Sequence, residues 1–325
     1  MIYTREQAIE IMNNLGAGRV PFLFIIDFEM KAIRIFHLDA IPSTLSFNFP
    51  GNSKLPVSDK YKESYYFKKH PLSLSQYEKA FAEVKKQILG GNSFLLNLTF
   101  PTQIETNLTL SDIYKYSQAK YKLLLNNEFV CFSPETFVTI ISDGIIASYP
   151  MKGTIKASEP EARKKIMNNP KEIAEHHTIV DLIRNDLSMV AKDVMVRNFR
   201  YIETLKTNEG DILQVSSEII GRLPANYYQN LGNIMFKLLP AGSITGAPKA
   251  KTIAIIESVE QEKRGYYTGV CGYFDGSKLD SAVMIRFIEH HNNTLRFRSG
   301  GGITCNSDME SEYRELTDKV YVPIV

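Results

Sequence analysis

The chain has 325 residues, 44% of them hydrophobic and 23% charged, which is typical of globular proteins and excludes disordered and fibrous classes. The formal net charge is +2, and no block of lysine and arginine could follow a phosphate backbone, which argues against nucleic acid as a partner. The three cysteines, Cys131, Cys271 and Cys305, indicate neither a disulfide framework nor a cysteine-rich zinc site and favour the cytoplasm. Residues 22–26, the longest early apolar run, are too few to span a membrane, and the residues before them lack the layout of a signal peptide.

The first half of the chain predicts strands with one clear helix among them. Alternating polarity over residues 22–38 indicates a strand pair, and the Pro-, Ser- and Asn-rich residues 42–60 indicate a long loop. Ser75 and Glu78 match a capping box, which predicts a helix that ends before Gly90 and Gly91. Further strands are predicted at residues 94–100, 129–132, 137–141 and 145–149.

The second half predicts a long helix, a group of strands and a closing helix. The helix covers residues 170–187, the strands 269–274, 281–290 and 294–298, and the last helix 308–320. Strands that come in hairpins, with helices between the groups, favour antiparallel sheets over a parallel doubly wound sheet. The sequence therefore predicts an α+β fold.

Two pairs of glutamates have helical spacing. Glu172 and Glu175 are three residues apart on the first of these helices, and Glu312 and Glu315 repeat the spacing on the last helix. Four carboxylates that converge from two helices suit Mg²⁺, which prefers oxygen ligands and keeps several waters. Either pair taken alone is typical of a solvated helix face, and Lys319 is placed to form a surface pair with Glu315.

A loop of small residues from Gly242 to Lys249 leads into a helical stretch, with Pro248 suited to the first turn. Backbone N–H groups at a helix start and the charge of Lys249 favour an anion. The loop lacks the glycine spacing of a Walker phosphate loop, which favours a carboxylate over a nucleotide.

An arginine and a run of glycines complete the candidate site. In the predicted strand 281–290, Arg286 interrupts an apolar face, so it either meets a structural acid or binds a carboxylate with both arms of its guanidinium. Gly300, Gly301 and Gly302 offer backbone donors before the last helix, although a flexible strand-to-helix turn explains them equally well.

Together, these segments resemble the chorismate-utilising family, which includes anthranilate, aminodeoxychorismate, isochorismate and salicylate synthases. The matching stretches lie in family order and comprise residues 133–135, 150–154, 171–176, 179–187, 242–249, 285–286 and 300–315. The resemblance implies two orthogonally packed antiparallel sheets flanked by helices, in α/β/β/α layers. It also implies one chorismate-binding domain over residues 1–325, with a shortened N-terminal part (1–70) and a catalytic core (75–325).

The resemblance assigns roles to these residues. It implies that Glu175 and Glu315 bind Mg²⁺ directly and that Glu172 and Glu312 hold its waters. The metal and Arg286 would bind the ring carboxylate of chorismate, and the dication would stabilise the negative charge that builds there. The substrate-binding set is completed by Thr245, Gly246, Lys249, Gly300, Gly301 and Gly302.

Lys152 distinguishes between members of the family. Anthranilate synthases carry a small alanine at this position, whereas the lysine resembles aminodeoxychorismate synthases. There the lysine attacks C2 of the ring while a glutamate, here Glu135, protonates the departing 4-hydroxyl, and ammonia then enters at C4 and expels the lysine. We therefore expect Lys152 to be partly desolvated or near another cation, and Glu135 to be shifted toward protonation.

The resemblance also predicts what lies outside this chain. The segment around Cys271 differs from a glutaminase nucleophile elbow because Tyr273 replaces its last glycine, so ammonia is expected from a separate glutamine amidotransferase subunit. The basic lysine of the water-using relatives is absent from residues 93–97, where Leu95 also departs from the glutamine of amine-forming members. No tryptophan-binding Leu-Leu-Glu-Ser site is found, so inhibition by tryptophan is not expected.

Two alternatives remain at this point. An anthranilate synthase component I would release anthranilate and pyruvate, which requires Lys152 to be a bystander. A chorismate-binding or scaffolding subunit without catalysis is disfavoured because Glu135, Lys152 and all four metal-site glutamates are present.

Overall fold

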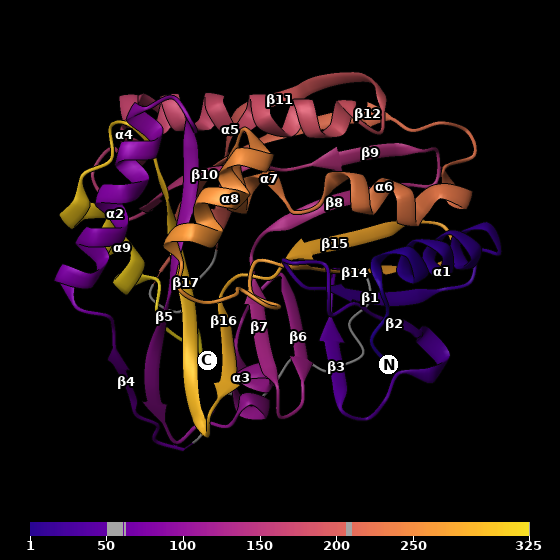
Figure 1. Cartoon of the computed structure of the whole chain (residues 1–325), viewed down its shortest axis with the longest axis horizontal. Helices are drawn as coiled ribbons and strands as arrows, with labels where there is room; N and C mark the ends of the chain where they lie inside the picture. Colours follow the sequence, from indigo (N-terminus) through magenta and orange to yellow (C-terminus); the bar gives the residue numbers. More distant parts are fainter. Residues whose placement is uncertain (51–60, 62, 206–209, 325) are drawn as a thin grey trace. The chain divides into compact units, whose positions relative to one another are not determined.

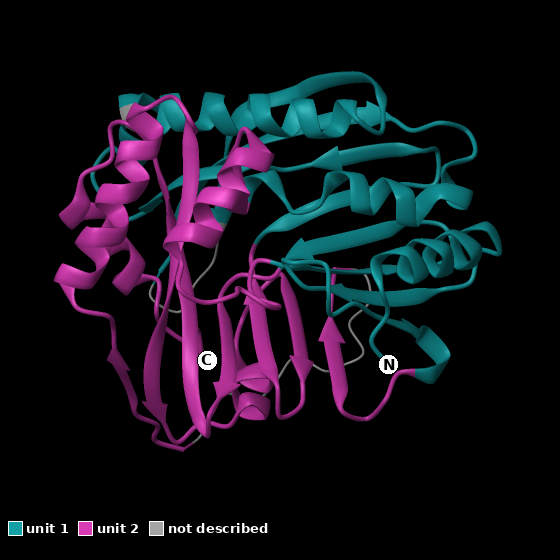
Figure 2. Cartoon of the chain, viewed as in Figure 1, with its two compact units in different colours: residues 1–40, 135–243, 269–283 teal, residues 41–134, 244–268, 284–325 magenta. Residues whose placement is uncertain are grey.

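The computed structural model describes residues 1–50, 61, 63–205 and 210–324 (Figure 1). The chain divides into two compact units, each built from three separate segments (Figure 2). Unit 1 comprises residues 1–40, 135–243 and 269–283, and unit 2 comprises residues 41–134, 244–268 and 284–325. Each unit contains one antiparallel sheet with helices, which confirms the predicted α+β class. The expectation of a single domain stays a prediction.

The sheet of unit 1 has the strand order β10-β12-β9-β8-β15-β14-β1-β2, with β11 paired to β12. Its strands are β1 (Phe22–Ile26), β2 (Arg34–His37), β8 (Thr136–Ile140), β9 (Ile145–Ser148), β10 (Met151–Lys156), β11 (Lys192–Leu205), β12 (Ile212–Arg222), β14 (Val270–Phe274) and β15 (Leu279–Val283). Its helical segments are α1 (Arg5–Ala17), η1 (Leu38–Ala40), α4 (Ala162–Asn168), α5 (Pro170–Ser188), η2 (Tyr227–Asn230) and α6 (Leu231–Leu238). The strand pair predicted at residues 22–38 is thus confirmed as β1 and β2.

The sheet of unit 2 has the order β13-β5-β17-β16-β7-β6-β3, with β4 paired to β5. Its strands are β3 (Leu45–Asn48), β4 (Phe67–His70), β5 (Leu95–Thr106), β6 (Tyr121–Leu125), β7 (Phe129–Ser133), β13 (Gly246–Ala247), β16 (Phe287–His291) and β17 (Thr294–Ile303). Its helices are α2 (Leu74–Leu89), α3 (Leu110–Tyr116), α8 (Lys249–Val259) and α9 (Met309–Asp318). The short α7 (Gly242–Thr245) lies where a segment of unit 1 gives way to one of unit 2.

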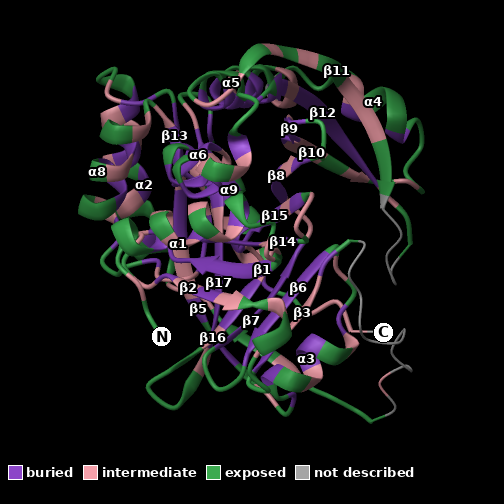
Figure 3. Cartoon of the chain, turned by 90° about the vertical axis from the view of Figure 1, so that its right-hand side faces the viewer, coloured by how far each residue is buried: buried purple, intermediate pink, exposed green. Residues whose placement is uncertain are grey.

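Helix α2 shows how the sequence specifies a packed element in unit 2. Its buried residues Tyr77, Phe81, Val84 and Ile88 lie in one apolar cluster with residues of β5, α8, β17 and α9. Burial of such side chains contributes about 1.5–3 kcal/mol each. The helix is accordingly buried along one side and exposed along the other (Figure 3). Among the described residues, no helix combines the length and apolarity that crossing a membrane requires.

Three predictions about single elements were wrong. The capping box of α2 is formed by Ser73 and Gln76, and Ser75 lies inside the first turn. The loop predicted at residues 42–60 contains β3, while residues 51–60 lie outside the described part. The predicted strand 281–290 is two strands, β15 in unit 1 and β16 in unit 2, because the chain leaves the extended conformation at Arg286, whose φ is 53°.

Candidate active site

The first glutamate pair lies on α5 of unit 1. Pro170 occupies its first position, where a missing N–H costs nothing, and the Asn169 side chain accepts a hydrogen bond from the Glu172 N–H at 3.3 Å. Glu172 lies in the first turn, where the helix dipole favours an anion, and Glu175 follows one turn later, only 6% exposed.

Lys152 of β10 contacts this pair directly. Its Nζ lies 2.6 Å from Glu175 Oε2, and the two side chains are 24% and 7% exposed. The expected partial desolvation of Lys152 is therefore observed. Its ion-pair partner, however, is a carboxylate, which favours the charged ammonium and is the opposite of the neighbouring cation considered from the sequence.

Gly153 brings the backbone of β10 close to Glu172. Its φ is +81°, and a Cβ there would lie 3.1 Å from Glu172 Oε2. Any other residue would be strained in this conformation and would crowd the carboxylate. Gly153 and Glu172 also line a cavity of about 250 Å³ in unit 1. Space is thus kept open beside Glu172.

Glu135 lies at the start of a unit 1 segment, just before β8. Its carbonyl accepts a hydrogen bond from the Val283 N–H at 3.1 Å, and its Oε1 accepts one from the Ser243 hydroxyl. Hydrogen bonds therefore hold both the backbone carbonyl and the side-chain carboxylate of Glu135. The sequence singled out the loop that contains Ser243 for a possible anion but did not connect this hydroxyl with Glu135.

His176 follows Glu175 and is fully buried in unit 1. Its Nε2 lies 2.6 Å from Ser217 Oγ. Burial, and next the positive charge of Arg200, lower the pKa of His176 to about 4. The imidazole is consequently neutral at physiological pH, and the residue after the proposed metal ligand is uncharged.

The second glutamate pair lies on α9 of unit 2, whose N-terminus is capped by Asp308. Glu312 is 2% exposed, and a Cβ on Gly301 would lie 3.3 Å from its Oε2. Glu315 is more exposed, and its Oε1 accepts a hydrogen bond from Lys319 Nζ at 2.6 Å. Lys319 also donates to the Gly300 carbonyl at 2.8 Å, so the pair predicted between Lys319 and Glu315 is confirmed and is tied to β17.

The glycine run and Arg286 differ from their predicted settings. Gly300, Gly301 and Gly302 belong to β17 and pair with β5, so they do not form a turn before the last helix. Arg286 lies between β15 and β16 and is therefore not part of an apolar strand face. Its guanidinium lies 5.7 Å from the centre of the Tyr321 ring, and its φ of 53° is of the strained kind found at functional sites.

The predicted substrate loop contains α7, β13 and the start of α8. Thr245 is fully buried, and Gly246 has φ +132° with space for no side chain, because a Cβ would lie 1.8 Å from the Leu95 carbonyl oxygen. Pro248 precedes α8, and Lys249 is its first residue. The loop therefore runs directly into a helix, as the sequence indicates.

The carboxylates suit Mg²⁺ in chemistry, since all four offer oxygen donors and two are nearly buried. Gly153 and Gly301 leave room beside Glu172 and Glu312, where a side chain would intrude. In the part of the chain that the structure describes, no three His, Cys, Asp or Glu side chains group closely enough to hold a metal. A complete site would thus need both pairs, and their convergence stays a prediction.

The structure brings together part of the predicted site within each unit. Lys152 and Glu175 are in contact in unit 1, and the glycine run adjoins Glu312 and Glu315 in unit 2. Sequence reasoning missed Ser243, His176 and Gly153 as site residues. All three lie inside or beside stretches already singled out, so the available signal was their adjacency to Glu175, Lys152 and the loop.

Comparison with known proteins shows which family these segments are typical of. A family model described as chorismate binding enzyme matches residues 49–324. An uncharacterized PabA-like protein of Haemophilus influenzae is 49% identical over 322 residues, which cover 99% of this chain and 98% of that protein. Aminodeoxychorismate synthase component 1 of Klebsiella aerogenes is 26% identical, over 94% of this chain and 69% of that protein.

A solved structure shares the fold. Anthranilate synthase component I from Streptococcus pneumoniae superposes with a TM-score of 0.68 at 20% identity, over 92% of this chain and 79% of that one. At this identity the similarity shows the fold alone. The Klebsiella aerogenes and Streptococcus pneumoniae proteins are named for different activities, so these names do not decide the reaction of this chain.

Proposed function

Because the chain belongs to the family of chorismate binding enzymes, we propose that it is the synthase component of an aminodeoxychorismate synthase. It would convert chorismate and ammonia to 4-amino-4-deoxychorismate, for p-aminobenzoate and folate, in the cytoplasm. A separate glutamine amidotransferase subunit would supply the ammonia. The observation that carries this proposal is the contact of Lys152 with Glu175, because it puts an amine next to a proposed metal ligand.

The proposed reaction uses Lys152 as the nucleophile and Glu135 as the acid. Lys152 first loses a proton, because only the neutral amine is a nucleophile; its nitrogen then forms a bond to ring C2 while the C4–oxygen bond breaks, and Glu135 gives its proton to the departing hydroxyl. Ammonia then bonds to C4 as the lysine leaves C2, and the ring diene is restored. The hydrogen bond from Ser243 holds Glu135 in one orientation during proton transfer.

The remaining residues would bind the substrate and the metal. Glu175 and Glu315 would hold Mg²⁺, with Glu172 and Glu312 holding its waters, and the ion would stabilise charge at the ring carboxylate when bound. Arg286 offers a planar guanidinium to the same carboxylate. Thr245, Gly246, Lys249 and the glycines 300–302 would surround the ring.

Product analysis tests the proposal. The purified chain is incubated with chorismate, ammonium and Mg²⁺, and the product is identified by mass. We expect a product that retains the enolpyruvyl group. Release of anthranilate and pyruvate together would identify an anthranilate synthase component instead, and no turnover of chorismate with ammonium would leave only a binding role.

A further inference from the structure

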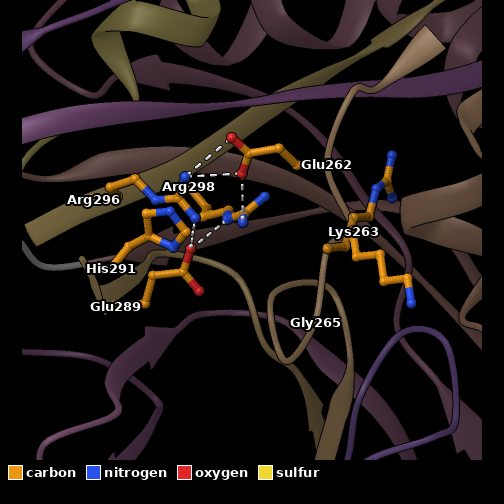
Figure 4. Close-up of a pocket in the computed structure, with 8 residues that line it drawn as sticks. Glu262, Lys263, Gly265, Glu289, His291, Arg296 and Arg298 are labelled. Atoms are coloured by element: carbon orange, nitrogen blue, oxygen red, sulfur yellow. Dashed lines mark hydrogen bonds and ion pairs between the residues drawn. The ribbon is translucent and has the colours of Figure 1, made fainter.

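A second cavity, of about 420 Å³, lies in unit 2 and is lined mainly by charged side chains (Figure 4). It is formed by the loop after α8 and by the β16–β17 hairpin. The lining residues are Glu262, Lys263, Arg264, Gly265, Glu289, His291, Arg296 and Arg298. None of them belongs to the predicted chorismate or magnesium site.

Two buried arginines form one wall of this cavity. Arg296 and Arg298 are two residues apart on β17, so their side chains lie on the same face of the sheet. They are 9% and 5% exposed, and burial of a charge is costly unless it is paired. Glu289, which lies opposite Arg296 on β16, contacts both guanidinium groups at 3.0 and 2.8 Å.

A second carboxylate reaches the same two arginines from the loop. Glu262 lies 2.8 Å from Arg296 Nη1 and 3.4 Å from Arg298 Nη2. It approaches the guanidinium groups from the side opposite Glu289 (Figure 4). Its side chain is 46% exposed, against 18% for Glu289, so Glu262 is the carboxylate that water and solutes can reach.

The charges of the wall are balanced only while Glu262 is in place. Arg264 has its own buried partner, Glu260, at 2.6 Å, and Lys263 and His291 are exposed. If Glu262 moved into solvent, two buried guanidinium groups would share the single carboxylate of Glu289. An oxyanion in the cavity would restore the balance, because arginine binds both carboxylate and phosphate groups in planar, bidentate contacts.

We propose that this cavity binds a small anionic ligand through a carboxylate or phosphate group, and that the Glu262 carboxylate holds the ligand's place when the cavity is empty. Ligand oxygens replace Glu262 on Arg296 and Arg298. The site is separate from the proposed reaction and requires neither chorismate nor ammonia.

Anion titration of the full chain tests this proposal. Inorganic phosphate and malonate are titrated calorimetrically into the wild type, Glu262→Gln and Glu257→Gln at constant ionic strength. Glu257→Gln is the matched control because Glu257 is an exposed glutamate of α8 outside the cavity. We expect Glu262→Gln to bind one of the two anions about tenfold or more tightly than the wild type, since it keeps the volume of Glu262 and removes the competing charge. Which anion binds tells phosphate from carboxylate ligands.

A purely structural ion-pair network predicts the opposite outcome. In that case neither anion binds saturably to Glu262→Gln, or Glu262→Gln and Glu257→Gln bind alike, and either result overturns the proposal. In the Glu262→Gln background, a further Arg298→Gln change should abolish binding. Because the titration contains no chorismate, its failure would leave the proposed function untouched.

Discussion

The two glutamate pairs resemble each other in spacing and differ in how their lysines are held. In unit 1, Glu175 is nearly buried and meets Lys152 from a strand more than twenty residues earlier in the chain. In unit 2, Glu315 is 46% exposed and meets Lys319 one turn later on the same helix. A contact within one helix contributes only about 0.2–0.5 kcal/mol, whereas breaking a buried pair leaves an uncompensated charge. We therefore expect substitution of the lysine, or of a residue beside the glutamate pair, to have a larger effect on activity and stability in unit 1 than in unit 2.

The largest effect is expected for Lys152→Ala compared with Lys319→Ala. If Lys152 is the nucleophile, its loss should lower the rate of product formation with ammonium by roughly 10³-fold or more. Lys319→Ala should have a much smaller effect, and rates measured by mass spectrometry of the product compare the two. Equal activity of Lys152→Ala and the wild type would exclude the proposed covalent step.

The second comparison concerns the glycines that lie against the two pairs. Gly153→Ala should lower activity roughly 10- to 100-fold, since a Cβ would displace Glu172. It should also cost about 1–2 kcal/mol of stability, because alanine is strained at a φ of +81°. Gly301 has no positive φ, so Gly301→Ala should be milder in both respects. Chemical denaturation and the Mg²⁺ dependence of the rate measure these effects, and a Gly301→Ala defect as large as that of Gly153→Ala would contradict the ranking.

The third prediction uses the residue that follows each pair, His176 in unit 1 and Leu316 in unit 2. The pKa of His176 is about 4 in the folded chain, below its ordinary value of 6.5. The unfolded chain therefore binds the proton more readily, and the free energy of unfolding should fall as pH drops from about 6.5 to 4, by up to about 1.4 kcal/mol per pH unit. This contribution is fully present above pH 6.5.

Replacement of the histidine isolates this contribution. His176→Asn should show a shallower pH dependence of the unfolding free energy than the wild type, measured in metal-free buffer. Leu316→Met serves as the matched control at the corresponding place in unit 2 and should keep the wild-type slope. Identical slopes in His176→Asn and the wild type would show that the histidine does not titrate differently on unfolding.

The smallest effect is expected from Lys319→Met on stability. The helix pair with Glu315 and the bond to the Gly300 carbonyl are partly exposed, so their loss should cost only about 0.5–1.5 kcal/mol in denaturant unfolding. A larger loss would mean that α9 depends on this lysine for its attachment to β17.

Local patterns predicted much of the fold. The face of α2, the hairpin of β1 and β2 and the extent of α5 follow from apolar periodicity and turn residues. Periodicity failed at residues 281–290, because an apolar run does not reveal where a chain changes sheets. Single-residue backbone geometry, such as the positive φ of Arg286, has no signature in composition.

The candidate site, like the fold, could be predicted only where its residues lie close together in the sequence. Spacing on one helix placed Glu172 with Glu175 and Glu312 with Glu315. Contacts such as Lys152 with Glu175 and Ser243 with Glu135 join residues distant in sequence, so only tertiary structure or family resemblance indicates them. The anion cavity had no sequence signal, because Glu262 and Arg298 lie on separate elements of ordinary composition.

The interleaving of the two units constrains any attempt to divide the protein. Each sheet draws its strands from three segments that alternate along the chain with those of the other sheet, so no single cut releases either sheet as a continuous polypeptide. A shortened gene product would expose unpaired strand edges, which favour aggregation. Neither unit can therefore be tested by truncation, and the contribution of each unit to stability and activity has to be measured by point substitutions in the intact chain.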